Sequence, residues 1–197
     1  MKTLTYVTTK DVNELAWPEL QQNTGLYSPA TSVFTDFKVS IPRVIEPTVR
    51  ADVLAKIMKK EHVRMKVVVD SNNTFLGVVS LEDLSEEAFV KQAAQGYLRD
   101  ELLAIDLMRA KDQLLAVSYA SLKNSDIESL IYSQKANQYQ HLLVVDEETK
   151  AIRGLISAND IVRQLKLNVD VSTSTSFAKL HDLLEGEYAN SKRLRVA

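Results

Sequence analysis

Two serine–aspartate pairs with the same spacing are the residues of this chain whose chemistry stands out. Ser80 lies three positions before Asp83, and Ser157 lies three positions before Asp160, 77 residues further along. A carboxylate can accept hydrogen bonds from both hydroxyls of a vicinal diol, and charge-assisted hydrogen bonds of this kind are the stronger class. A serine hydroxyl can bond a further hydroxyl or a phosphate oxygen. The two pairs are therefore candidate ligand-binding residues.

The same spacing is also close to that of a helix cap. A serine at the N-cap accepts a hydrogen bond from the amide three residues on, and an aspartate in the first turn complements the helix dipole. A cap of this kind needs no ligand. The sequence leaves both interpretations open for each pair.

Each pair ends a stretch of the chain that is present twice. The apolar runs Val67–Val69 and Leu142–Val145 are each followed by a polar turn and a second apolar run, at Phe75–Val79 and Ile152–Ile156. Two such runs around a short polar turn predict a β-hairpin. A glycine lies three positions before each serine. A sequence unit that recurs in this way predicts one supersecondary unit used twice.

Helices are expected around the hairpins, because apolar residues recur there at helical spacing. One helix is expected after Thr48 as N-cap and another after the capping-box pattern of Ser125 and Glu128. Two more are expected to begin directly at Ser80 and at Ser157. Further helices are expected over 86–107, with a break at Gly96, and over 177–188.

The composition excludes several classes of protein. The chain has 197 residues, a formal net charge of −2 and no cysteine, which argues against a nucleic-acid or anionic-membrane surface and excludes disulfides and thiolate sites. It begins without a signal peptide and contains no run long enough to span a membrane, so a cytoplasmic protein is expected. The three histidines show no metal-ligand spacing, and we find no catalytic constellation. We therefore expect a protein that is not an enzyme.

A β-α-β-β-α unit with a valine-rich strand and the pattern Gly-h-h-Ser-x-x-Asp, in which h is apolar, resembles the cystathionine β-synthase (CBS) domain. The two copies together resemble a tandem CBS pair, or Bateman module, over roughly residues 33–167. The resemblance implies an α/β (α+β) fold with two units about a pseudo-twofold axis. The boundaries expected are 1–31 for an N-terminal extension, 32–90 for unit 1, 91–104 for a linker helix, 105–168 for unit 2 and 169–197 for a C-terminal linker and helix.

The resemblance implies a regulatory module that binds an adenosine-containing ligand in a cleft between the units. AMP, ADP, ATP and S-adenosylmethionine are the candidate ligands, and no cofactor is required. The resemblance also implies a homodimer and a regulated partner protein. Ribose would then be bound by Ser80 and Asp83 in the first copy and by Ser157 and Asp160 in the second.

Basic residues before the hairpin reach the phosphates in this family, and the two copies differ there. The position falls on Arg64, near Lys66, in the first copy, and on Gln140, with His141 beside it, in the second. We therefore predict that the better nucleotide site lies near the first serine–aspartate pair. Adenine contacts, or simply core positions, are expected at the short strands, at Val44, Ile45, Ala116 and Val117.

Two other functions remain open at this stage. In one, both pairs are helix caps only, and the module dimerises or docks a partner. In the other, the protein is an enzyme that acts on a nucleotide, but the sequence supplies no catalytic group for it.

Overall fold

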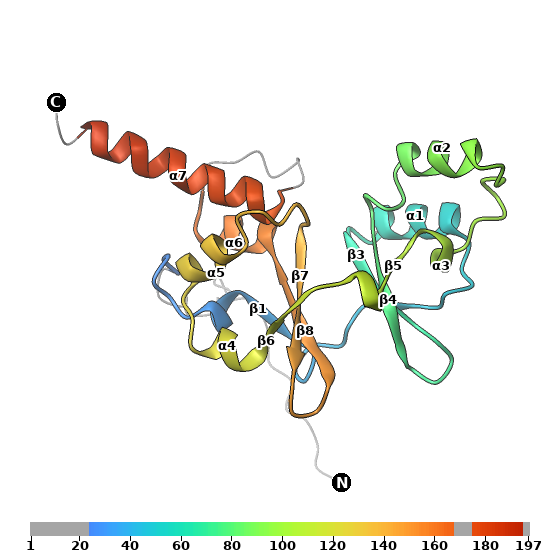
Figure 1. The fold of residues 1–197 in the computed structure, drawn as a ribbon, viewed down its shortest axis with the longest axis horizontal. Helices are drawn as coiled ribbons and strands as arrows, with labels where there is room; N and C mark the ends of the chain where they lie inside the picture. The colour runs from blue at the N-terminus through green and yellow to red at the C-terminus, as the bar shows by residue number, and fades with distance from the viewer. Residues whose placement is uncertain (1–23, 168–174, 195–197) are drawn as a thin grey trace, which may run out of the picture.

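The computed structural model describes residues 24–167 and 175–194, which form two halves with one four-stranded sheet each (Figure 1). The first sheet has the order β2 (Val44–Ile45), β3 (Met65–Val69), β4 (Phe75–Ser80), β5 (Arg109–Ala110). The second has the order β6 (Ala116–Ser118), β7 (His141–Asp146), β8 (Ala151–Ser157), β1 (Phe34–Asp36). In each sheet the first two strands are parallel and the others antiparallel, so the expected α+β fold with a repeated unit is confirmed.

The fourth strand of each sheet comes from the other half of the chain. Strand β1 lies within the expected unit 1 (32–90) but pairs with β8, and β5 lies within the expected unit 2 (105–168) but pairs with β4. The sheets therefore do not divide at the expected boundaries before residues 32 and 105. This exchange ties the halves together through backbone hydrogen bonds.

The two glycines of the repeat make room for these exchanged strands. A Cβ on Gly77 would overlap the carbonyl oxygen of Arg109 in β5, and a Cβ on Gly154 would overlap that of Thr35 in β1. Because the overlapping atom is backbone in both cases, no side-chain rearrangement can relieve it. The recurring glycine thus has a packing role.

Gly154→Ala should lower the free energy of unfolding by about 2 kcal/mol, because the new methyl group must push β1 away from β8. Urea denaturation followed by circular dichroism measures the change. Gly25→Ala is the matched control, since nothing lies within 4 Å of a Cβ at that position. Equal midpoints for the two variants would contradict this account of the glycine.

The helices of the first half differ from the expected ones at their ends. Helix α1 (Ala51–Lys60) begins after Arg50 rather than after Thr48. Residues 81–84 form a turn instead of the helix expected at Ser80. Helix α2 (Glu86–Ala94) begins after Ser85, whose hydroxyl accepts the Ala88 N–H at 3.3 Å.

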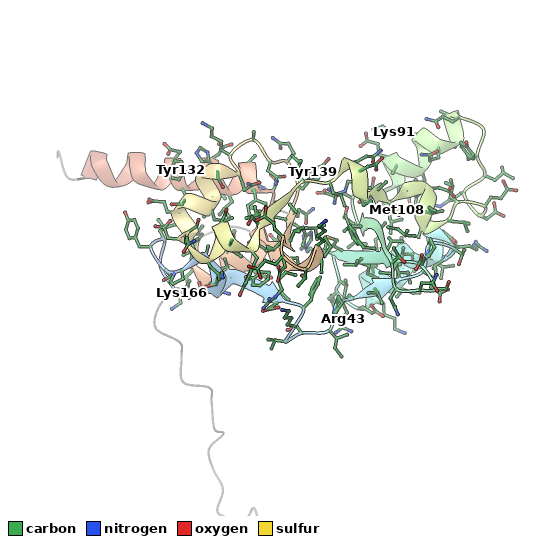
Figure 2. All side chains as sticks on the ribbon, turned by 60° about the horizontal axis from the view of Figure 1, so that its bottom comes forward. Arg43, Lys91, Met108, Tyr132, Tyr139 and Lys166 are labelled. Atoms are coloured by element: carbon green, nitrogen blue, oxygen red, sulfur yellow. The ribbon has the colours of Figure 1, made fainter. Side chains whose placement is uncertain are left out.

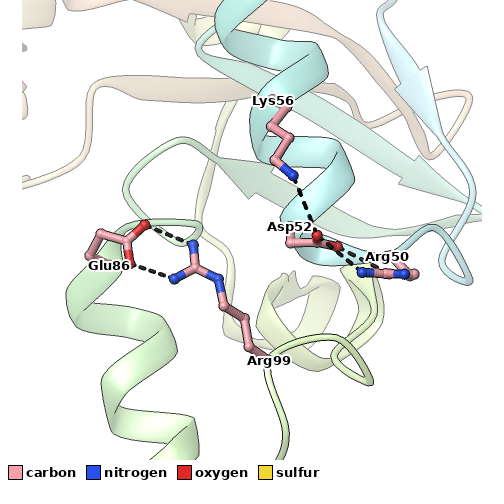
Figure 3. Close-up of polar contacts among 5 residues, drawn as sticks. All are labelled: Arg50, Asp52, Lys56, Glu86 and Arg99. Atoms are coloured by element: carbon pink, nitrogen blue, oxygen red, sulfur yellow. Dashed lines mark hydrogen bonds and ion pairs between the residues drawn. The ribbon is translucent and has the colours of Figure 1, made fainter.

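The expected linker helix over 91–104 is interrupted. Helix α2 ends two residues before Gly96, which has φ +93°, and the short α3 (Ala104–Leu107) follows later. In the loop between them, Arg99 makes a bidentate ion pair with Glu86 at 2.5 and 2.7 Å (Figure 3). On α1, Asp52 pairs with Arg50 and Lys56 in the same view. Exposed pairs of this kind add little stability.

The helices of the second half are η1 (Ala30–Val33), α4 (Tyr119–Lys123), α5 (Ile127–Ser133), α6 (Ala158–Gln164) and α7 (Phe177–Leu194), and α7 packs on α5 and α6. The short η2 (Lys111–Gln113) lies against β4 of the first sheet. The helix expected at Ser157 is thus confirmed as α6, and the final helix is longer than expected. The cap of α5 is Asp126, which accepts the Ser129 N–H at 2.8 Å, and not Ser125.

Three apolar clusters hold the fold. Two of them lie beneath the helices of the two halves, and the third lies between the sheets, where Met65 and Val78 pack against Leu143. Among the described helices, none is long and apolar enough to cross a membrane. Most of the expected N-terminal extension, residues 1–23, and residues 168–174 of the C-terminal linker lie outside the described residues.

Candidate functional site

The first serine–aspartate pair is closed by hydrogen bonds within itself. Oδ2 of Asp83 accepts hydrogen bonds from the backbone N–H of Ser80 at 2.8 Å and from its hydroxyl at 2.6 Å. The Asp83 N–H in turn donates to Ser80 Oγ at 3.3 Å. This is the reciprocal pattern of a capping box, formed here around the turn over residues 81–84. The capping interpretation therefore describes the first pair.

Arg109 also contacts Asp83. Its Nε lies 3.4 Å from Asp83 Oδ2, and its guanidinium lies 4.0 Å from the centre of the Tyr139 ring. The side chains of Arg109 and Asp83 are only 16% and 19% exposed. Tyr139 belongs to the second half and lies at the junction of the halves (Figure 2). Arg109 therefore bridges the halves at the first pair.

The second pair lines an open cleft of about 680 Å³ between the halves. Ser157 makes no side-chain cap hydrogen bond to the described backbone of α6, and Asp160 is 30% exposed and paired with Arg163. The first half supplies Lys59, His62 and Arg64 to the same cleft, and α6 supplies Arg163. Three permanent cations thus share the cleft with one carboxylate.

A second hollow, of about 490 Å³, adjoins the cleft. Asp160 and Arg163 line both spaces, and Ser32, Thr35 and Gln164 line the second one. Apart from the shared Asp160 and Arg163, the cleft has cationic side chains and the hollow only uncharged ones, so Asp160 lies between a cationic space and a hydroxyl-bearing one. An elongated ligand with one anionic end and one uncharged end matches these surroundings.

The structure places Arg64 in the cleft of the second pair, not beside the first pair as the sequence suggested. The segment from α1 to β3 faces the other half, so its basic residues serve the other copy's serine and aspartate. Lys66, the second basic residue expected near the first site, is buried and pairs with Glu61 at 2.9 Å. The cationic cleft is therefore that of the second pair.

His141 lies where the two halves meet. It lines the cleft of the second pair and also a hollow of about 610 Å³ beside Arg109. Burial lowers the pKa of His141 to about 4, the carboxylate of Asp160 opposes this shift, and the guanidinium groups of Arg109 and Arg64 add to it. His141 is therefore neutral at pH 7, where it can offer a hydrogen bond but no charge.

The stability of the protein should fall as the pH drops from 6.5 toward 4. The pKa of His141 is lower in the folded state than its ordinary value of 6.5, so the unfolded chain takes up the proton first. The neutral histidine contributes fully above pH 6.5, and up to about 3 kcal/mol is lost by pH 4. Urea denaturation at pH 7 and pH 4.5 measures the difference. His141→Gln should remove most of it, and an unchanged difference in that variant would contradict this assignment.

Asn159 is a cleft residue that the sequence analysis missed. Its side chain is buried, and neither its amide nitrogen nor its amide oxygen has a hydrogen-bond partner among the described residues. A buried amide without partners is costly, at about 1–3 kcal/mol for each unpaired group. Asn159 follows the serine by two positions, and no pattern in the sequence marks it.

Comparisons with known proteins identify the fold. A family model of the CBS domain matches residues 37–89. A CBS domain protein from Streptococcus pneumoniae TIGR4 is similar in structure over 70% of this chain and 82% of its own, with 18% identity and a TM-score of 0.50. The chain thus has the fold of a tandem CBS pair. An uncharacterised conserved protein from Pyrococcus horikoshii, at 13% identity and a TM-score of 0.53, covers 74% of the chain and 97% of its own length. No curated protein matches the sequence.

The two halves bring together some of the expected site residues and separate others. Ser157, Asp160, Arg64 and His141 share one cleft, whereas Ser80 and Asp83 lie behind Arg109. The short-strand residues expected to contact adenine line neither the cleft nor the adjoining hollow. Among the described residues, no group of three histidines or acidic residues is placed to hold a metal ion.

Proposed function

We propose that this CBS pair is a regulatory module that binds an adenosine-containing nucleotide in the cleft of Ser157 and Asp160. The observation that carries the proposal is the distribution of charged and uncharged side chains around Asp160. One solvent-accessible carboxylate lies between a cleft with three permanent cations and a hollow that, apart from Asp160 itself and the shared Arg163, is lined by uncharged residues. A nucleotide offers a diol to the carboxylate and phosphates to the cations at the same time.

Each part of the ligand has a matching group in the cleft. The carboxylate of Asp160 would accept the ribose hydroxyls, and the hydroxyl of Ser157 would bond a ribose or phosphate oxygen. Lys59, Arg64 and Arg163 would neutralise the phosphates. The cations favour AMP, ADP or ATP over S-adenosylmethionine, whose sulfonium and amino groups carry positive charge.

The first serine–aspartate pair supports the alternative function for its own copy. Ser80 and Asp83 already satisfy each other as a cap, as a non-catalytic interaction module would require. Apolar side chains of α1, Val53 and Ile57, are also exposed, at 38% and 36%. We propose that helix surfaces of this kind pair two chains in a homodimer and pass the ligand signal to a partner protein.

We propose no catalytic activity for the module. The cleft contains cations, a carboxylate paired with Arg163 and a histidine that is neutral at pH 7, and these groups suit binding. A general base would need to lie within hydrogen-bond reach of an attacking group.

Isothermal titration calorimetry with AMP, ADP, ATP and S-adenosylmethionine tests the proposal, with adenosine as the ligand that lacks phosphates. We expect the phosphate-bearing nucleotides to bind more tightly than adenosine and to raise the melting temperature, because they bind the folded state alone. The absence of both heat and melting shift for all five compounds would overturn the proposal.

A further inference from the structure

We call the cleft of Ser157 and Asp160 the second cleft and the equivalent region beside Ser80 and Asp83 the first cleft. The strand that was exchanged into each sheet carries a different residue at the equivalent position of the two clefts. Arg109 of β5 lies opposite Val78, and Thr35 of β1 lies opposite Leu155. Val78 and Leu155 each follow the repeat glycine by one residue. The glycines confirm the match, since a Cβ on Gly77 would meet the carbonyl of Arg109 and one on Gly154 would meet that of Thr35. Arg109 and Thr35 therefore occupy equivalent places beside the two serine–aspartate pairs.

The side chains at these equivalent places leave the two aspartates in different states. Thr35 is short and lines the hollow that it shares with Asp160. Arg109 extends to Asp83, with 3.4 Å between Nε and Oδ2, and stacks on the ring of Tyr139. The hollow on that side is lined by Arg109 and Tyr139 and not by Asp83.

The guanidinium of Arg109 is ion-paired with Asp83 and stacked on Tyr139, and both contacts gain from the exclusion of water, while Nε makes no hydrogen bond to a described residue. A ribose diol that approached Asp83 would have to displace this guanidinium. It would also have to break the hydrogen bonds between Ser80 and Asp83.

We propose that Arg109 occupies the first cleft in place of a ligand, so that each chain binds one nucleotide, at the second cleft. Arg109 thus determines which cleft binds the nucleotide, because the short side chain of Thr35 leaves the equivalent place at the second cleft open. This inference rests on the proposed nucleotide binding and adds the number and position of the bound molecules.

Calorimetric titration with ATP, reported as the number of molecules bound per chain, tests the inference. The wild-type protein should bind one. Arg109→Thr gives the first cleft the side chain that the second has at this position and should add a second, weaker binding event, because no other described lysine or arginine lines the hollow there. Asp83→Ala in that background should return the number to one. The mirror variant Thr35→Arg brings a guanidinium toward Asp160 and should weaken ATP binding at the second cleft at least tenfold.

The outcomes separate this inference from the proposed function. A wild-type protein that binds no ATP contradicts both. A wild-type protein that binds two, or an Arg109→Thr variant that still binds one, contradicts the inference alone. If circular dichroism shows that Arg109→Thr does not fold, Arg109→Gln replaces it. If neither folds, hydrogen exchange of the wild-type protein decides: ATP should protect residues 157–164 and leave residues 80–84 unchanged, and protection of both overturns the inference.

Discussion

Asp160→Ala should weaken the binding of AMP, ADP and ATP at least tenfold, while Asp83→Ala should leave the affinity unchanged. The two residues are the same position of the repeated motif, so each variant is the matched control of the other. Loss of a hydrogen bond to a charged group costs about 1.5–3 kcal/mol, which corresponds to a factor of about ten to a hundred in affinity.

The stability of the two variants should show the opposite order. Asp83 accepts two hydrogen bonds from Ser80 and pairs with the partly buried Arg109, so its removal should cost about 2 kcal/mol of unfolding free energy. Asp160 is more exposed and pairs within the same helix turn, so its removal should cost well under 1 kcal/mol. Calorimetry and urea denaturation measure the two quantities. Equal losses of affinity in the two variants would show that the pairs are equivalent, and the proposed site would be wrong.

The hairpins and the repeat could be predicted from the sequence because their signals are local. Each hairpin combines β-branched or apolar runs with a polar turn of a few residues, and the two halves contain these parts in the same order. The exchanged strands β1 and β5 are only three and two residues long. The partner of β1, strand β8, lies far along the chain, and no local pattern specifies such a pairing.

The ends of the helices were predicted less well because several residues compete for the same cap. Ser125 fits a capping box, yet Asp126 accepts the hydrogen bond from the Ser129 N–H. Thr48 has a side chain suited to a cap, yet α1 begins after Arg50, which makes no side-chain cap hydrogen bond. The ends of a helix therefore shift by one or two residues with little cost.

The candidate site was predicted in its residues but not in its grouping. The serine–aspartate pairs, Arg64 and His141 were all found from the sequence, but Arg64 was assigned to the wrong pair. Which half contributes which wall of a cleft depends on how the sheets pack through Met65, Val78 and Leu143. Arg109, which distinguishes the clefts, becomes recognisable only when the register of β4 and β5 is known.

Arg64→Glu should weaken the binding of ATP about a hundredfold and leave the binding of adenosine within a factor of about two. The substitution replaces one of three permanent cations in the cleft by an anion, so both lost attraction and new repulsion act on the phosphates. Adenosine carries no phosphate and therefore reports only on the ribose and base contacts.

Lys135→Glu is the control for this variant, because Lys135 is exposed and lies outside the cleft while the change in net charge is the same. Titrations at low and at high salt separate the two effects further. Salt screens an exposed charge at a distance more strongly than a contact within a cleft. The loss in Arg64→Glu should therefore persist at high salt, whereas any loss in Lys135→Glu should disappear. An equal loss of adenosine and ATP binding in Arg64→Glu would instead mean that Arg64 shapes the cleft as a whole and does not contact the phosphates.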